Sequence, residues 1–183
     1  LAENTLVLWV ADHGDSLASH GGIWDKSNTM TEEVMRVPMA ARWPGETAAG
    51  ETCARPVSNM DVTATMLSAA GLEVPGHMHS RSILPLCRDP RRAEWPGWIA
   101  CEHHGHGEVM PMRMLVERGH KYVAAIYGGD ELYDRAADPH EKRNLIDSPE
   151  HAPLAREMRA RLAAHIEESD PSREGQKLLY ALR

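Results

Sequence analysis

An unbroken run of six apolar residues near the start of the chain, Leu6 to Ala11, most constrains how it can fold. The run lacks polar alternation, which indicates a strand buried on both faces, as in a parallel α/β sheet. Asp12, His13 and Gly14 follow where that strand ends. Open α/β sheets place their ligand sites beyond the carboxyl ends of the strands, so a site is predicted here. A plain turn with a surface histidine is the simpler interpretation of an isolated Asp-His-Gly.

The side chains of Asp12 and His13 are a carboxylate and an imidazole, which form a compact pair of metal ligands. Lys26 lies downstream in the segment Trp24-Asp25-Lys26 and can supply a positive charge to an anionic group held on that metal. The alternative for Lys26 is a solvated surface residue, the usual place of a lysine. The motifs found along the rest of the chain favour the functional interpretation.

Several motifs occur in a recognisable order, with gaps that leave most of the chain covered. They are Val10-Ala-Asp-His-Gly-Asp-Ser-Leu-Ala-Ser-His20-Gly, Trp24-Asp-Lys26, Glu32-Glu-Val-Met-Arg36-Val-Pro38, Val57 to Leu67, Arg81-Ser-Ile-Leu-Pro-Leu86, and Glu131-Leu-Tyr-Asp134 continuing to Asn144-Leu145. Together they resemble the sulfatase family of the alkaline phosphatase superfamily. Each motif is weak alone, whereas the ordered set is specific.

Local sequence patterns predict the helices and strands along the chain. Val37–Trp43 is expected to be a second strand, and Asp61 is expected to cap a helix over residues 62–70 that ends at Gly71. Residues 85–96 are expected to be a linker. Short strand-like runs separated by glycine turns predict an antiparallel sheet, and apolar residues at helical spacing predict a helix over residues 152–168. These runs are Trp98–Cys101, Met112–Val116, Lys121–Tyr127 and Glu131–Tyr133.

The resemblance implies the same architecture. It is a mixed, mainly parallel α/β sulfatase domain followed by a small C-terminal antiparallel sheet with a terminal helix. We therefore expect residues 1–90 to be the C-terminal part of the α/β catalytic domain. Residues 91–183 are expected to be the small antiparallel-sheet subdomain with its closing helix.

The resemblance also implies roles for individual residues. Asp12 matches a metal-binding aspartate of the family, whose divalent cation, usually Ca²⁺, binds the sulfate oxygens. His13 lies where family members carry Asn or His, so it is expected to ligate the metal or to hydrogen-bond the nucleophile. Lys26 matches a catalytic lysine that contacts the sulfate group and stabilises charge on the bridging oxygen. Because Ca²⁺ takes ~6–8 ligands, Asp12 and His13 cannot form its site alone.

Three further histidines are candidate substrate-binding residues. His20 either donates a hydrogen bond to substrate or packs its own loop. His104 and His106 belong to the tract Glu102-His-His-Gly-His-Gly107, which some family members share near the mouth of the active site. For this tract, substrate contact by His104 or His106, a separate metal site and a purely structural loop all remain open.

The nucleophile expected from the family is absent from the sequence. Sulfatases make a formylglycine from Cys or Ser in a Cys/Ser-x-Pro-x-Arg motif upstream of the Asp-His-Gly strand. The chain's own cysteines, Cys53, Cys87 and Cys101, all lack that context. We therefore expect the chain to be the C-terminal part of a sulfatase-like enzyme and to be inactive alone.

Composition narrows the function classes. A net charge of −7 argues against a nucleic-acid-binding protein, which normally carries a basic face. No apolar run approaches the ~20 residues of a membrane span. The favoured function is a sulfuric ester hydrolase acting on a small-molecule or saccharide sulfate ester. The alternatives are a phosphonate or phosphate ester hydrolase of the same superfamily and a non-catalytic remnant.

Overall fold

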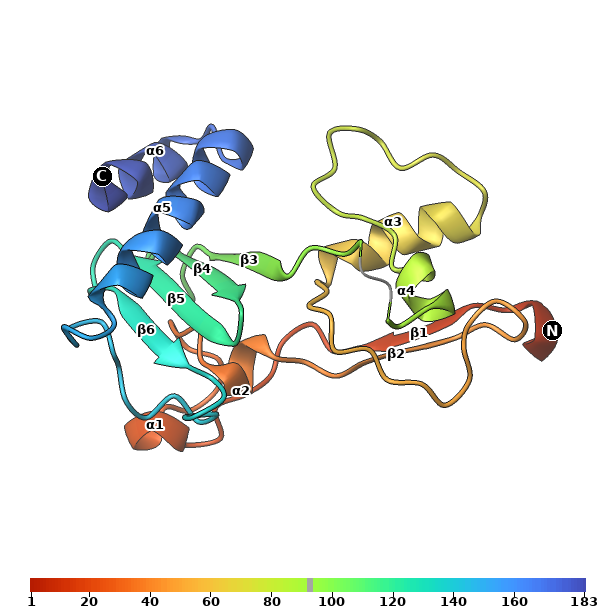
Figure 1. Ribbon diagram of the computed structural model, residues 1–183, viewed down its shortest axis with the longest axis horizontal. Helices are drawn as coiled ribbons and strands as arrows, with labels where there is room; N and C mark the ends of the chain where they lie inside the picture. The colour runs from red at the N-terminus through yellow and green to blue at the C-terminus, as the bar shows by residue number, and fades with distance from the viewer. Residues whose placement is uncertain (92–93) are drawn as a thin grey trace. The chain divides into compact units, whose positions relative to one another are not determined.

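The computed structural model describes residues 1–91 and 94–183. The chain forms two compact units, each made of two stretches of sequence. The first unit contains Leu1–Asp12 and Val37–Gly97, and the second contains His13–Arg36 and Trp98–Arg183 (Figure 1). Residues 13–36 thus group with the C-terminal sheet and not with the strand that precedes them. The expected division at residue 90 concerns the domains of a whole enzyme and stays a prediction.

The first unit is built on a pair of antiparallel strands, β1 (Val7–Val10) and β2 (Met39–Arg42), preceded by a short 3-10 helix (Ala2–Asn4). Both strands were predicted, but the expected parallel pairing is wrong here, because β1 and β2 are antiparallel. Alternate side chains of β1 are exposed within the described residues, and burial of both its faces in a whole enzyme stays a prediction. Val7 is 48% exposed and Trp9 is 61% exposed.

The helix predicted over residues 62–70 is α3 (Met60–Ala69), and the expected role of Asp61 as its N-cap is wrong. Asn59 occupies the cap position, and Asp61 lies in the first turn. The buried carboxylate of Asp61 instead accepts hydrogen bonds from the backbone N–H groups of Ser58 and Arg81, both at 2.9 Å. It joins the start of α3 to a segment much later in the chain.

The end of α3 is as predicted. Gly71 adopts a φ of 72°, a left-handed conformation that glycine reaches without steric cost. Its N–H group bonds to the carbonyl of Ser68, and the N–H group of Leu72 bonds to the carbonyl of Leu67. This pair of bonds is a Schellman cap, which satisfies carbonyls left over at the helix end.

The segment expected to be a linker over residues 85–96 is partly helical. It begins within α4 (Leu84–Arg88), where Leu84 and Leu86 are buried. Burial of these two leucines favours a compact turn of helix over an extended connection. Residues 92–93 of the expected linker lie outside the described residues.

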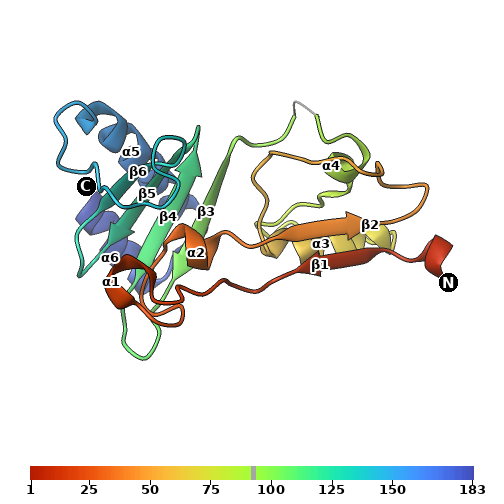
Figure 2. The same cartoon turned by 90° about the horizontal axis from the view of Figure 1, so that it is seen from below.

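The second unit contains the predicted antiparallel sheet. Its strands lie in the order β3-β4-β5-β6, each antiparallel to the next (Figure 2). Gly119, with a φ of 81°, lies in the turn between β4 and β5. The strands are β3 (Trp98–His103), β4 (Met112–Glu117), β5 (His120–Ala125) and β6 (Glu131–Asp134).

Two helices cover one face of this sheet. The predicted helix is α5 (Ala152–Ser169), and a second helix, α6 (Arg173–Leu182), was not predicted. Their apolar side chains form one core with Leu115 and Tyr122 of the sheet. The start of α6 carries a recognisable signal, because the hydroxyl of Ser172 accepts a hydrogen bond from the N–H group of Gly175. No described helix is long and apolar enough to cross a membrane.

The opposite face of the sheet is covered by residues 13–36, which include the helical turns α1 (Ser19–Gly22) and α2 (Glu32–Met35). Met30 packs there against the methionines of β4. Neighbouring residues of a strand point to opposite faces. Each strand of this sheet therefore carries one set of side chains toward α5 and α6 and another toward residues 13–36.

A buried group of charges attaches residues 13–36 to the sheet. Lys121 is fully buried and donates to the carbonyl of Met30 at 2.7 Å. Its ammonium lies 2.5 Å from Glu141 and 3.3 Å from Glu32. Burial disfavours charge on Glu32, but the hydrogen bond from Arg135 and the charge of Lys121 outweigh it, so its pKa lies below the ordinary value. The segment that carries Lys26 is therefore tied to β5 by the ion pair between Lys121 and Glu32 and by the hydrogen bond from Lys121 to Met30.

Cysteine reactivity provides a check on this packing. Burial raises the pKa of the Cys101 thiol to about 11, and burial also raises the pKa of Cys87, whereas Cys53 is exposed. Because the thiolate is the reactive form, we expect iodoacetamide at about pH 8 to alkylate Cys53 first and Cys101 at least about a hundredfold more slowly. Mass spectrometry of peptides over time measures the order. Equal native rates for Cys53 and Cys101 would contradict the packing of β3.

Candidate active-site loop

Lys26 and His13, each predicted from the sequence to be catalytic, lie together in the second unit. The ammonium of Lys26 lies 3.2 Å from Nε2 of His13, and Nδ1 of His13 lies 2.8 Å from the carbonyl of Gly14. A carbonyl can only accept, so this network assigns the imidazole proton to Nδ1. Nε2 then accepts a hydrogen bond from Lys26. His13 therefore holds the end of a long, flexible side chain in one place.

Asp25 stabilises the backbone at Lys26 through its carboxylate. Its carboxylate accepts a hydrogen bond from the N–H group of Lys26 at 2.7 Å and lies 3.5 Å from Nε2 of His106. That backbone hydrogen bond, helped by the charge of Lys26, keeps the pKa of Asp25 below its ordinary value. Asp25 has a φ of 63°, a left-handed conformation that aspartate tolerates better than most residues. The tight turn directs Lys26 toward His13.

Asn28 joins this loop to the histidine-rich loop after β3. Its Oδ1 accepts hydrogen bonds from the N–H group of His106 at 2.6 Å and from Nε2 of His103 at 3.1 Å. Its Nδ2 donates to the carbonyl of His106 at 3.3 Å. The structure thus brings His106 next to the segment that carries Lys26, through Asp25 and Asn28. Asn28, Asp25 and His103 were missed, because no spacing rule connects them across the chain.

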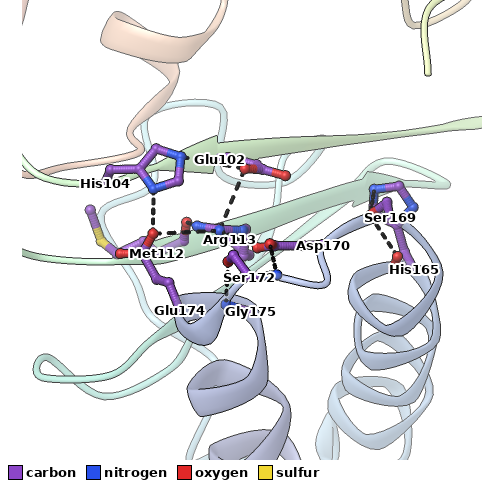
Figure 3. Close-up of polar contacts among 10 residues, drawn as sticks. All are labelled: Glu102, His104, Met112, Arg113, His165, Ser169, Asp170, Ser172, Glu174 and Gly175. Atoms are coloured by element: carbon purple, nitrogen blue, oxygen red, sulfur yellow. Dashed lines mark hydrogen bonds and ion pairs between the residues drawn. The ribbon is translucent and has the colours of Figure 1, made fainter. Parts of the chain in front are cut away.

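His104, also expected to bind substrate, lies on the other face of the sheet. Its Nδ1 is 2.5 Å from Glu174 and its Nε2 is 3.4 Å from Glu102 (Figure 3). His103 and His104 are neighbours at the end of an extended strand, so their side chains point in opposite directions. Any part taken by His104 in substrate binding stays a prediction.

A buried arginine, Arg113, shares the acidic partner Glu102 with His104. Arg113 is 2% exposed and donates to Asp170 at 2.7 Å and to the carbonyl of Met112 at 3.0 Å (Figure 3). Burial disfavours charge on Asp170, but hydrogen bonds from Ser172 and Arg113 outweigh it and lower its pKa. Arg113 also lies 3.4 Å from Glu102. This cluster links β3 and β4 to the start of α6.

His20 pairs with an acidic residue of its own segment. Its Nε2 lies 3.1 Å from Glu33, and both line a hollow of about 410 Å³ together with Ser19, His140 and Lys142. Burial disfavours charge on Glu33, but hydrogen bonds, including that from His20, outweigh it and lower its pKa. His20 therefore packs the loop, one of the two roles weighed for it, and its contact with substrate stays a prediction.

The predicted cation ligands do not form a complete metal site. Among the described residues no group of three or more His, Cys, Asp or Glu side chains is arranged to hold a metal ion. Asp12 belongs to the first unit, where its carbonyl accepts a hydrogen bond from Asn59 at 2.9 Å. Both ring nitrogens of His13 already face Gly14 and Lys26. Because Ca²⁺ needs ~6–8 oxygen ligands, the described residues alone do not fit a Ca²⁺ site.

Comparison with known proteins identifies relatives of the whole chain. The family model for N-sulphoglucosamine sulphohydrolase, C-terminal, matches residues 19–168. An uncharacterized sulfatase, YidJ, of Escherichia coli K12 is 34% identical, over 93% of this chain and 34% of its own length. A Delta 4,5-hexuronate-2-O-sulfatase of Bacteroides thetaiotaomicron is 31% identical, over 91% of this chain and 35% of its own length. The chain spans about a third of the length of these curated relatives.

Solved structures agree with this result. A 2-O GAG sulfatase superimposes with a TM-score of 0.83 at 30% identity, over 92% of this chain and 37% of its own. A protein solved in complex with its substrate D-glucosamine-2-N,6-O-disulfate gives a TM-score of 0.86 at 25% identity, over 96% of this chain and 36% of its own. The expected fold class, mixed α/β with a small antiparallel sheet and a terminal helix, is confirmed. The chain belongs to the sulfatase family, within the group described by the C-terminal part of N-sulphoglucosamine sulphohydrolase.

Proposed function

We propose that this chain is the C-terminal part of an enzyme that hydrolyses sulfuric esters, and that Lys26 contacts the sulfate ester. One observation carries the proposal beyond family membership, namely the hydrogen bond between Lys26 and His13. It fixes an ammonium group in a cluster that also contains His106. A fixed cation beside further N–H donors suits a ligand that carries negative charge on oxygen.

In this proposal Lys26 acts on the leaving group. When the sulfur–oxygen bond breaks, negative charge grows on the bridging oxygen, and an ammonium aimed at that atom stabilises the transition state more than the bound substrate. His13 keeps the ammonium aligned by accepting a hydrogen bond from it. His106, whose ring lies near Asp25, would donate to a sulfate or sugar oxygen.

We further propose that Asp12 contributes one carboxylate to a divalent cation, most simply Ca²⁺, whose other ligands come from the rest of the enzyme. Such a cation would bind sulfate oxygens and withdraw electron density from sulfur. The proposed nucleophile is a formylglycine that this chain does not contain. These assignments rest on the family resemblance of Asp12 and His13.

For the substrate we propose a sulfated saccharide. Support comes from relatives named for saccharide substrates, among them the hexuronate-2-O-sulfatase and an N-acetylglucosamine-6-O-sulfatase that is 28% identical over 163 residues. A choline-sulfatase is 33% identical over 152 residues, so a small alkyl sulfate belongs in the same test. Phosphonate monoester hydrolases are similar at 20–21% identity, which is evidence for the fold alone.

The test is a substrate panel on the full-length enzyme that contains this chain. We expect sulfate release from an aryl sulfate and from sulfated glucosamine or hexuronate, at rates well above those for an aryl phosphonate monoester. The chain alone, assayed with Ca²⁺, should release no sulfate, because the nucleophile is missing. Faster phosphonate hydrolysis would overturn the proposed reaction. Sulfate turnover by the repurified chain alone would overturn the assignment of the nucleophile.

A further inference from the structure

Asn28 uses its whole amide group to connect two loops. Its Oδ1 and Nδ2 bond to the N–H group and the carbonyl of one residue, His106, as a neighbouring strand would. The same Oδ1 accepts from Nε2 of His103. We propose that Asn28 is a positioning residue, which fixes Lys26 relative to His106 so that both meet the same anionic group. This inference rests on the proposed function of Lys26.

The orientation of the Asn28 amide is determined by its partners. The N–H group of His106 can only donate, so it must meet the oxygen of the amide, and the carbonyl of His106 must meet the nitrogen. A reversed amide would place donor against donor and acceptor against acceptor. Three hydrogen bonds therefore select asparagine at this position, because aspartate lacks the donor and alanine lacks both groups.

His103 contributes as a neutral donor. Oδ1 of Asn28 carries no proton, so Nε2 of His103 must carry one to bond with it. Burial lowers the pKa of His103, and the nearby charges of His104, His106 and Lys26 lower it further. The imidazole therefore stays neutral around pH 7, and Asn28 holds it without needing a charge.

Both loops have constrained backbone conformations next to this contact. Ser27, the one residue between Lys26 and Asn28, has a φ of 46°, which allows little freedom for a non-glycine residue. On the other side, Gly105 has a φ of 118°, and a Cβ there would come within 1.8 Å of the carbonyl oxygen of Glu108. Both segments thus follow tight backbone paths, and Asn28 joins one to the other.

The test compares three variants in the full-length enzyme. Asn28→Asp keeps the shape and the acceptor but replaces the donor with an oxygen facing the carbonyl of His106. Asn28→Ala removes all three bonds. Thr29→Ala changes the neighbouring side chain and serves as the matched control. For each variant we measure kcat and KM for a sulfate ester, the melting temperature and backbone hydrogen exchange.

For Asn28→Asp we expect kcat to fall about 10–100-fold with KM changed less than about threefold, because misplacing a catalytic group affects the transition state most. Hydrogen exchange should accelerate in residues 103–106, because the contact with the carbonyl of His106 is lost. Asn28→Ala should lower kcat at least as much, with melting close to wild type. Thr29→Ala should change neither kcat nor exchange.

The outcomes separate the two claims. An unchanged kcat in Asn28→Asp, or a loss of kcat that merely tracks a loss of melting temperature, overturns the positioning role. Unchanged exchange in residues 103–106 overturns it as well, because the loops would then be held without Asn28. Exchange that accelerates as expected, in an enzyme whose wild type hydrolyses no sulfate ester, would leave Asn28 as a structural link between the loops. The proposed function would then fail.

Discussion

Replacing Lys26 with alanine in the full-length enzyme is expected to lower turnover by about 10²–10³-fold, the usual cost of losing one donor to a developing oxyanion. Substrate binding should weaken far less, because the bridging oxygen gains most of its negative charge only as the sulfur–oxygen bond breaks. The structure adds a reason to expect a clean effect. His13 accepts a hydrogen bond from Lys26 at 3.2 Å, so the ammonium is held in place before substrate arrives.

Two further variants make this result specific. Lys26→Arg should restore activity only in part, because a planar guanidinium does not place its charge where the ammonium of Lys26 does. Lys177→Ala removes an exposed lysine of α6 and should leave turnover unchanged. Steady-state kinetics with an alkyl sulfate measures all three, since a poor leaving group keeps the chemical step limiting. Equal turnover in Lys26→Ala and wild type would show Lys26 to be a surface residue.

Replacing Lys121 with methionine is expected to lower the free energy of unfolding by about 3–5 kcal/mol, the typical cost of removing one partner from a buried ion pair. The length of the side chain is nearly kept, so the main loss is charge. Glu141 and Glu32 would be left buried beside each other, and the carbonyl of Met30 would lose its donor. Because this group ties residues 13–36 to β5, Lys26 should also lose its support.

The matched control is the double variant Lys121→Met with Glu141→Leu. Removing both partners leaves less uncompensated charge, so the double variant should be more stable than Lys121→Met alone. Urea denaturation monitored by circular dichroism measures both. A loss below about 1 kcal/mol in the single variant would mean that Lys121 and its carboxylates contribute little net stability, as exposed pairs do.

Local patterns predicted the second unit well, because its elements are defined by nearby residues. Each of the four strands of its sheet was recognised as a short strand-like run, and Gly119 marks a turn that needs a positive φ. The setting of β1 was not predictable in this way. Six apolar residues indicate two buried faces, yet the burial of each face depends on what packs over it, and the direction of pairing depends on the neighbouring strand. The predicted N-cap role of Asp61 failed for a related reason, because its carboxylate accepts a hydrogen bond from Arg81, a residue distant in sequence.

For the candidate site, the candidate residues were easier to predict from the sequence than the contacts between them. Lys26, His13 and His106 were selected from sequence and lie in one cluster, although their roles stay predictions. The separation of His103 from His104 was predictable from the alternation of side chains along β3. The contact between Asn28 and His106 was not, because it joins two loops through the fold of the whole second unit.

The central claim, that Lys26 stabilises the leaving oxygen of a sulfate ester, is tested most directly by the dependence of rate on leaving group. The measurement is the slope of log kcat/KM against leaving-group pKa, across a series of aryl sulfates, for wild type and Lys26→Ala. We predict a steeper slope in Lys26→Ala, with the largest loss for the poorest leaving groups, because a stable phenolate needs less help. Parallel lines, with the same loss for every substrate, would contradict the claim and place Lys26 in uniform binding of the sulfate group.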